Sequence, residues 1–180
     1  MSATNAPFGM RLAFHNSGVI RPRALVGGIS SGYGSTILSG QPVLLTSSGL
    51  LNPVVANNVD FVGVFAGCEY TTSGGSKRVI DNKWLANATY DTGSMIAYFY
   101  DDPTITYEIQ ADGSVAQTAI GDQANLSNFT AGSTVTGLSQ ATMSSSLVGN
   151  WTWVSIVVAT PLIEPLPGSS SPLQVGHQGS

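Results

Sequence analysis

The chain has 180 residues, of which 9% are charged, and its 6 Lys and Arg against 10 Asp and Glu give a formal net charge of −4. So few charges argue against a bundle of surface helices, whose exposed faces need Lys and Glu, while a hydrophobic fraction of 42% argues against intrinsic disorder. With so few basic residues, the chain can hardly form the basic surface with which proteins bind nucleic acids.

The first predicted element is an extended N-terminal arm over residues 1–23, because Pro and Gly interrupt this stretch and its apolar residues lack helical spacing. The arm is basic. Residues 1–59 contain Arg11, Arg21 and Arg23 but no acidic residue, whereas the remainder contains all of the acidic residues. This asymmetry predicts that the arm meets an acidic surface, either of its own domain or of a partner, unless it is chance among so few charges.

Residues 24–160 form the predicted folded domain, in which short apolar runs alternate with turn residues. Within the segment Met95–Tyr100, Tyr98 and Tyr100 should share one face of a strand while Phe99 takes the other. The Asp112-Gly113 turn suggests that residues 114–120 return as the partner of the preceding strand. Strands are predicted at 24–29, 35–38, 42–46, 61–66, 95–100, 104–110 and 151–159.

Residues 161–180 are rich in Pro, Gly and Ser and are predicted to form a C-terminal tail. The whole pattern predicts an all-β fold, a β-barrel or a β-sandwich of the tulip or jelly-roll kind, with extended arms at both ends.

Cys68 is the only cysteine, so the chain can form no intrachain disulfide, and we expect a buried free thiol. The N-terminus lacks the apolar core of a secretory signal, and no apolar run is long enough to span a membrane. We therefore expect a soluble protein made in a cytoplasm, with no membrane partner.

The segment Asp91-Thr92-Gly93-Ser94 resembles the active-site signature of aspartic proteases. Those enzymes pair two carboxylates that share one proton, so a single copy would require a dimer. The residues before Asp91 are Ala, Thr and Tyr rather than the aliphatic residues of the protease pattern. A turn before the strand at 95–100 is therefore the favoured interpretation.

The two histidines, His15 and His177, fall in the predicted arm and tail, so we do not expect either to be fixed in a Ser-His-Asp relay or in a metal site. Asp91, Asp101, Asp102 and Asp112 could supply oxygen ligands to calcium, but they lack EF-hand spacing, and Asp before Pro or Gly is typical of turns. The sequence thus predicts no catalytic residue, no cofactor and no metal.

Three blocks of sequence, in order, resemble the capsid cement (head decoration) proteins of tailed bacteriophages. The resemblance covers residues 21 to 157, and the segment after Trp151 departs from the family pattern. The blocks are SGQPVLLTSSGLL followed by DFVGVFAGCEY and NKWLAN, then TYEIQADGSVAQTAIGDQANL, then AGSTVTGLSQATM.

The resemblance implies a non-enzymatic protein that lies on the outer capsid surface of the virion and stabilises contacts between major capsid subunits. Proteins of this family are β-rich homo-oligomers, with trimers near local threefold axes favoured. Neither nucleic acid nor membrane is an implied partner.

The arm offers the candidate contact residues for the capsid or for a neighbouring protomer, although an arm folded back on its own domain is the alternative. Two other functions also stay open. One is a receptor- or glycan-binding β module of a phage tail or fibre, and the other is a dimeric aspartic protease centred on Asp91. The candidate contact residues are Phe8, Arg11, Phe14, Arg21 and Arg23.

Overall fold

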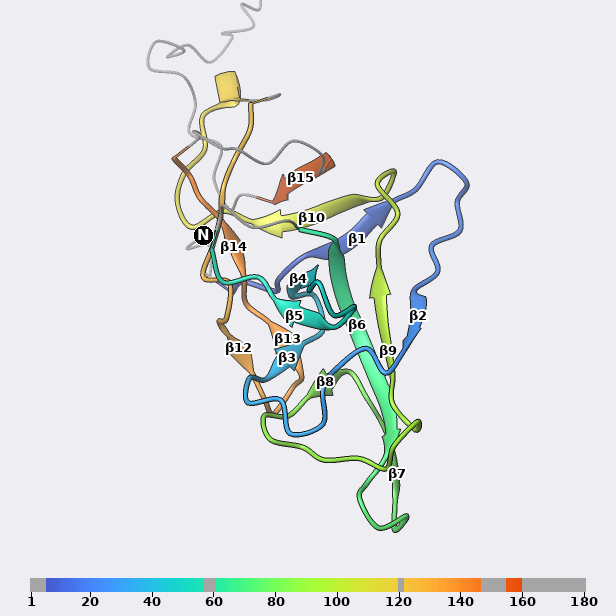
Figure 1. The fold of residues 1–180 in the computed structure, drawn as a ribbon. Coiled ribbons are helices and arrows are strands. Elements are labelled where there is room, and N and C mark those ends of the chain that lie inside the picture. Colours follow the sequence, from blue (N-terminus) through green and yellow to red (C-terminus); the bar gives the residue numbers. More distant parts are fainter. Residues whose placement is uncertain (1–5, 57–60, 120–121, 147–154, 160–180) are drawn as a thin grey trace, which may run out of the picture.

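The computed structural model describes residues 6–56, 61–119, 122–146 and 155–159 (Figure 1). Over these residues the protein is all-β, as predicted, and its one helical element is a short 3-10 turn at Gln117–Ala119. No described helix is long and apolar enough to cross a membrane.

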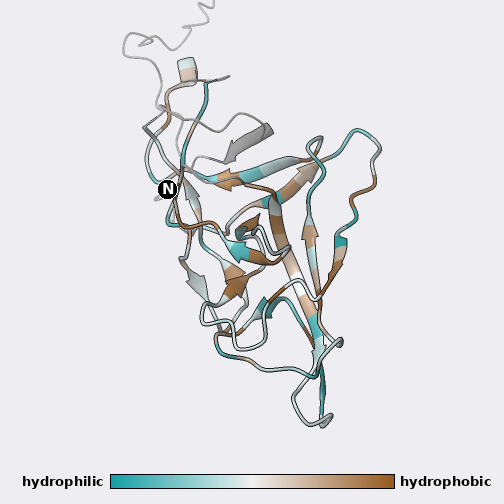
Figure 2. Ribbon diagram, in the orientation of Figure 1, coloured by the Kyte–Doolittle hydropathy of each residue, from teal (hydrophilic) through white to brown (hydrophobic). Residues whose placement is uncertain are grey.

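The large sheet runs in the order β2-β9-β6-β4-β5, with β7 paired to β6, and all of its pairings are antiparallel (Figure 1). The longest strand, β6, pairs with β9 on one side and with β4 and β7 on the other. Hydrophobic residues extend along β9 and the first part of β6 (Figure 2). The strands are β2 (Arg23–Val26), β4 (Pro42–Leu45), β5 (Leu51–Pro53), β6 (Gly63–Thr71), β7 (Arg78–Asp81) and β9 (Ile96–Tyr100).

The small sheet has the order β1-β10-β15 and joins segments that are far apart in the sequence. Its central strand β10 pairs antiparallel with β1 and parallel with β15. Among the described residues, three two-stranded ladders accompany the two larger sheets, pairing β3 with β8, β11 with β14 and β12 with β13. These elements are β1 (Arg11–Phe14), β3 (Ile37–Leu38), β8 (Lys83–Trp84), β10 (Thr106–Gln110), β11 (Leu126–Ser127), β12 (Gly132–Ser133), β13 (Leu138–Ser139), β14 (Thr142–Met143) and β15 (Ser155–Ala159).

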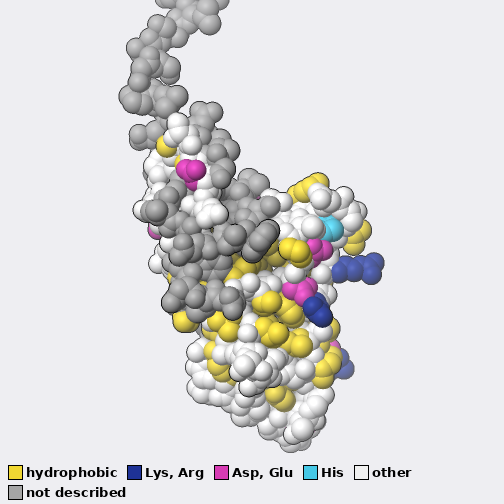
Figure 3. All heavy atoms as spheres, turned by 45° about the horizontal axis from the view of Figure 1, so that its top comes forward, with side chains coloured by type: hydrophobic (Ala, Val, Ile, Leu, Met, Phe, Trp, Pro, Cys, Tyr) yellow, Lys and Arg dark blue, Asp and Glu magenta, His cyan; other side chains and the backbone are white. Residues whose placement is uncertain are grey.

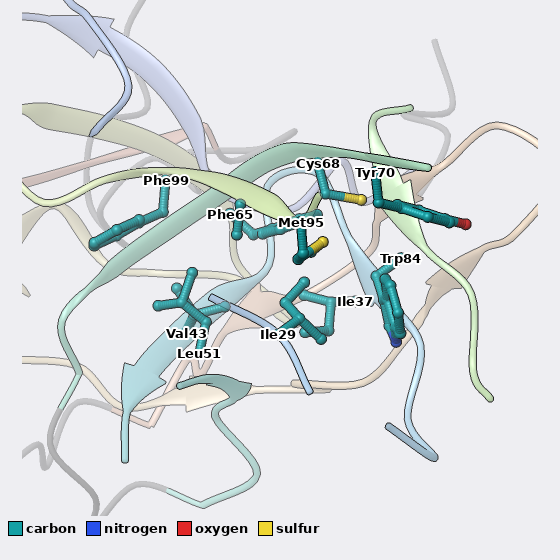
Figure 4. Packing of buried hydrophobic residues seen from close by; sticks show 11 residues of the cluster. Ile29, Ile37, Val43, Leu51, Phe65, Cys68, Tyr70, Trp84, Met95 and Phe99 are labelled. Carbon is teal, nitrogen blue, oxygen red and sulfur yellow. The ribbon is translucent and has the colours of Figure 1, made fainter. Parts of the chain in front are cut away.

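One hydrophobic cluster fills the concave side of the large sheet (Figure 4). Trp84 is fully buried, with its ring 5.4 Å from that of Tyr70 and 6.1 Å from that of Tyr90. On β9 the buried residues alternate with half-buried tyrosines, which confirms the predicted faces of Tyr98, Phe99 and Tyr100. The buried members are Ile29, Ile37, Val43, Leu51, Phe65, Cys68, Tyr70, Trp84, Met95, Ala97 and Phe99.

A second cluster lies under the small sheet. Val64 and Phe65 are neighbours on β6, and because successive strand residues point to opposite faces, Val64 joins the second cluster while Phe65 joins the first. The large sheet therefore lies between the two clusters, which gives the fold its sandwich-like character. The second cluster consists of Met10, Val64, Ile105, Tyr107, Ile109, Ala111, Leu126 and Met143.

No sheet among the described strands closes into a barrel. The two ends of the large sheet approach each other at one point, where the backbone N–H of Leu51 on β5 donates to the carbonyl of Gly28, at 2.7 Å. The segment that follows β2 thus reaches β5 and helps to enclose the first cluster.

The structure places several predicted segments differently. Residues 6–23, expected as an arm, lie on their own domain: β1 pairs with β10, Met10 is buried, and β2 begins at Arg23. The proposed return of residues 114–120 as the partner of β10 is wrong, because β1 and β15 take both sides of that strand. The tail at 161–180 and the first part of the strand predicted at 151–159 lie outside the described residues.

Candidate interaction surface

The N-terminal segment supplies an edge strand to each of the two main sheets. β1 is an edge of the small sheet, β2 is an edge of the large sheet, and residues 15–22 join them as a loop (Figure 1). We call the exposed basic and large apolar side chains of this segment, together with the half-buried Phe8 that lies against Arg11, the N-terminal ridge. It consists of Phe8, Arg11, Phe14, Val19, Arg21, Arg23 and Val26.

Two arginines of the ridge pair with carboxylates of the same chain. The Arg11 guanidinium donates to Oε2 of Glu108 from Nη2 at 2.5 Å and from Nε at 3.1 Å, and it lies 4.7 Å from the centre of the Phe8 ring. Arg23 Nη1 donates to Oδ2 of Asp101 at 2.5 Å. The basic segment thus meets acidic residues of its own domain, one of the two outcomes that the sequence left open.

These ion pairs leave the cations accessible. The side chains of Arg11 and Arg23 are 61% and 67% exposed, so each guanidinium keeps donors that face solvent. Arg21 is exposed and takes part in none of the ion pairs found among the described residues. Exposed pairs of this kind contribute little to stability, so a partner can bind these cations at low cost.

Large hydrophobic side chains lie beside these cations. Phe14 is 58% exposed, Val19 55% and Val26 71%. In Figure 3, hydrophobic side chains adjoin Lys and Arg at one edge of the molecule. An apolar surface that adjoins cations on two sheet edges is typical of an interaction site.

The ridge loop is anchored by His15, a contact that the sequence analysis missed. His15 Nε2 lies 3.0 Å from Oδ2 of Asp102 and 2.7 Å from Oγ1 of Thr104, while the backbone N–H of Ser17 donates to Nδ1 at 3.1 Å. The imidazole is only 13% exposed. Hydrogen bonds from the Thr104 hydroxyl and backbone, with a smaller contribution from His15, lower the pKa of Asp102. No local pattern signals this contact, because His15 and Asp102 are 87 positions apart.

His15 contacts both Ser17 and Asp102, and its hydrogen bonds to Ser17 belong to a local turn. Ser17 Oγ lies 2.6 Å from His15 Nδ1, yet the hydroxyl also donates to the Val19 carbonyl at 3.2 Å and accepts from the Val19 N–H at 3.3 Å. The same histidine nitrogen also accepts the backbone N–H of Ser17, at 3.1 Å. These hydrogen bonds between residues two positions apart fix the loop. The other histidine, His177, lies outside the described residues.

The Asp91-Thr92-Gly93-Ser94 segment forms the predicted turn before β9. Asp91 Oδ1 accepts the Gly74 N–H at 2.9 Å, and the Ser94 hydroxyl donates to the Asp91 carbonyl at 2.7 Å and accepts the Thr71 N–H at 3.1 Å. These bonds tie the turn to the end of β6 and to the loop that follows it. The Asp91 carboxylate therefore already has a structural partner.

The remaining acidic candidates also serve local structure. Asp112 accepts the Ser145 N–H at 2.8 Å and the Ser127 hydroxyl at 3.1 Å. Within the part of the chain that the structure describes, no three His, Cys, Asp or Glu side chains gather as a metal site would require.

A small hollow of about 100 Å³ lies beside the ridge, between the turn after β9 and the start of β6. Its lining includes Phe61, Tyr100, Tyr107 and the two carboxylates Asp101 and Asp102. It is smaller than the pockets that hold drug-sized ligands, and its carboxylates bind Arg23 and His15. We assign it no ligand.

Comparisons of the chain with family models, curated proteins and solved structures give no match.

Proposed function

We propose that the protein is a decoration protein of a tailed-bacteriophage head, one that binds the outer capsid surface and stabilises contacts between major capsid subunits. The observation that carries the proposal is the N-terminal ridge, where apolar and cationic side chains are exposed together along edge strands of both sheets. The three blocks of sequence that resemble this family supply the identity of the partner.

The composition suits a protein that is covered by neighbours over much of its surface. Burying an unpaired charge costs far more than burying a hydroxyl or amide group that finds a hydrogen-bond partner. Only 9% of the residues are charged, so a large contact can form without removing many charges from water.

The stabilising effect follows from binding to the assembled head and not to its separated subunits. A ligand that binds only one state of an equilibrium shifts the equilibrium toward that state. Each bound copy adds interface that must break before the capsid subunits separate. Acting as a homo-oligomer, with a trimer favoured, the protein would join several subunits at once.

The test is to add purified protein to heads that lack it and to measure the temperature at which the heads break open. We expect an increase with wild-type protein, and a smaller increase with Phe14→Ser and Arg21→Glu. Ile80→Ser is the matched control, because Ile80 is a large apolar residue at least as exposed as Phe14 but lies on β7, away from the ridge. If wild-type protein does not bind heads, or if immunogold labels the tail or its fibres instead, the proposal is wrong.

A further inference from the structure

The outer edge of β2 carries two peptide groups that point away from the sheet. The backbone N–H of Gly27 donates to the Met95 carbonyl at 2.7 Å, directly beyond the paired residues Val26 and Ile96. Because hydrogen-bonded pairs alternate along an antiparallel ladder, Leu25 also bonds to β9, whereas Ala24 and Val26 direct their N–H and C=O groups outward. Both residues are exposed, and no backbone bond to another part of the described chain uses these groups.

In the two main sheets, the other edge strands whose side chains are described each carry a feature that discourages pairing. β1 has an irregular register between Leu12 and Phe14, and β5 contains Pro53. β7 begins at Arg78 and ends at Asp81, and both side chains form ion pairs. Bulges, prolines and charges are the usual means by which proteins protect sheet edges. β2 has a regular register, no internal proline and one charged residue, Arg23, at its first position, whereas β7 has a charge at each end.

We propose that β2 takes an extended strand from a partner polypeptide, and that this strand carries a carboxylate opposite Arg23. The inference rests on the proposed function, in which the partner is the capsid subunit. Charge complementarity selects the occupant: β2 carries Arg23 and no acidic residue, and the Arg23 side chain stays 67% exposed although it binds Asp101. A second copy of β2 would instead bring one basic edge against another.

The side chains of β2 specify the pattern of the added strand. Residues directly opposite one another in a sheet have Cβ atoms about 4.5–5.5 Å apart, so a carboxylate opposite Arg23 would reach the exposed part of its guanidinium. Val26 is largely exposed and would pack against an apolar residue. An added antiparallel strand therefore has an apolar residue first and an Asp or Glu three positions later. The peptide bonds supply affinity, and these two side chains supply specificity.

The decisive variant is Ala24→Pro, which removes an N–H that β2 does not use in its own sheet. We expect the circular dichroism and the unfolding midpoint to stay close to wild type, while affinity for heads falls about tenfold or more through lost strand hydrogen bonds. Ala24→Ser keeps the N–H and should bind as wild type does. Arg23→Glu should also weaken binding, because it would face the partner's carboxylate. Hydrogen exchange on bound heads should slow at the amides of Ala24 and Val26.

Each outcome distinguishes this inference from the proposed function. If wild-type protein and the Ala24→Pro variant bind heads equally well, the strand inference is overturned and the proposed function stands. If wild-type protein does not bind, both are overturned. If Ala24→Pro does not fold, hydrogen exchange at the amides of Ala24 and Val26 in bound wild-type protein tests the inference. The inference is overturned if exchange at these amides does not slow on binding. If the free protein forms dimers and Ala24→Pro abolishes them, a second copy of the chain pairs with the outer edge of β2. The proposal of an acidic partner strand is then wrong.

Discussion

His15 Nε2, in the loop after β1, lies 3.0 Å from Oδ2 of Asp102, in the turn between β9 and β10. This contact joins the loop between the two edge strands to the turn that leads from the large sheet to the small one. It therefore holds the N-terminal ridge against the domain at the point where the ridge crosses from one sheet to the other.

Replacing His15 with Ala should release the ridge loop without unfolding the domain. The Ser17 N–H loses its acceptor and Asp102 loses one partner, so hydrogen exchange should become faster at the amides of Ser17 and Val19. The β-sheet signal in circular dichroism should not change. Asn16→Ala, at the exposed neighbouring position, is the control and should leave exchange as in wild type. Unchanged exchange at Ser17 in the His15 variant would show that the histidine does not anchor the loop.

Gly63→Ala should destabilise the fold, because β6 and β9 approach each other closely at this position. A Cβ on Gly63 would overlap the Tyr100 carbonyl oxygen and lie 2.9 Å from the carbonyl carbon. These are backbone atoms of a paired strand, so the clash cannot be relieved by turning a side chain. We expect a loss of about 1–3 kcal/mol in the free energy of unfolding, measured by urea denaturation. Gly34→Ala is the matched control, because its Cβ would meet nothing closer than Asn87 Oδ1 at 3.8 Å.

Cys68 should be inert to thiol reagents while the protein is folded. Burial, with a smaller contribution from Asp81, raises the pKa of the thiol to about 12, and the thiol donates to the Lys83 carbonyl at 3.3 Å. At pH 8 we expect no reaction with a disulfide reagent in buffer and one thiol per chain in denaturant. The raised pKa also means that the thiol ionises first in the unfolded chain, so stability should decline as the pH rises above about 9. Rapid labelling of the folded protein would contradict this burial.

Acid should weaken the fold partly through Glu69. A hydrogen bond from Arg78 at 2.8 Å and another from Tyr98 at 2.9 Å lower the pKa of Glu69 below its ordinary value of 4.5. A carboxylate with a lowered folded-state pKa contributes stability above the unfolded-state pKa, and this contribution is lost as the pH falls through the folded-state value.

The urea midpoint should therefore fall below pH 5, and Glu69→Gln should make the decline shallower. Asp122→Asn, at an exposed position, should leave the decline as in wild type. An equally steep decline in Glu69→Gln would show that Glu69 does not contribute to the pH dependence.

Local pattern predicted the strands whose alternation is strong. The segments at 42–46, 95–100 and 104–110 correspond to β4, β9 and β10, and the buried free thiol of Cys68 is confirmed. The strand expected at 24–29 is shorter, because Gly27 has a φ of 67° and ends the extended backbone there.

The pairings could not be predicted, because they join residues that are distant in the sequence. Arg11 meets Glu108 across 97 positions, and nothing in the residues near Arg11 indicates that its segment is a strand of the small sheet. β8 was missed for the same reason: Lys83–Trp84 becomes a strand only by pairing with β3. Phe8, Arg11, Phe14, Arg21 and Arg23 were nominated by charge and apolar character, whereas the exposure of Val19 and Val26 was not anticipated. The attachment of the ridge to β10 and to the turn after β9 depends on tertiary structure.

The small sheet has a consequence for how the protein is made. Its central strand β10 lies between β1, from the beginning of the chain, and β15, which follows the last ladder. As the ribosome extends the chain, β1 cannot pair until β10 has been synthesised. One edge of β10 then stays unpaired until residues 155–159 emerge. Contacts between such distant segments form slowly, since a long loop must close before they are made. Of the sheets in the described part of the chain, the small sheet is therefore the one that completes last during synthesis.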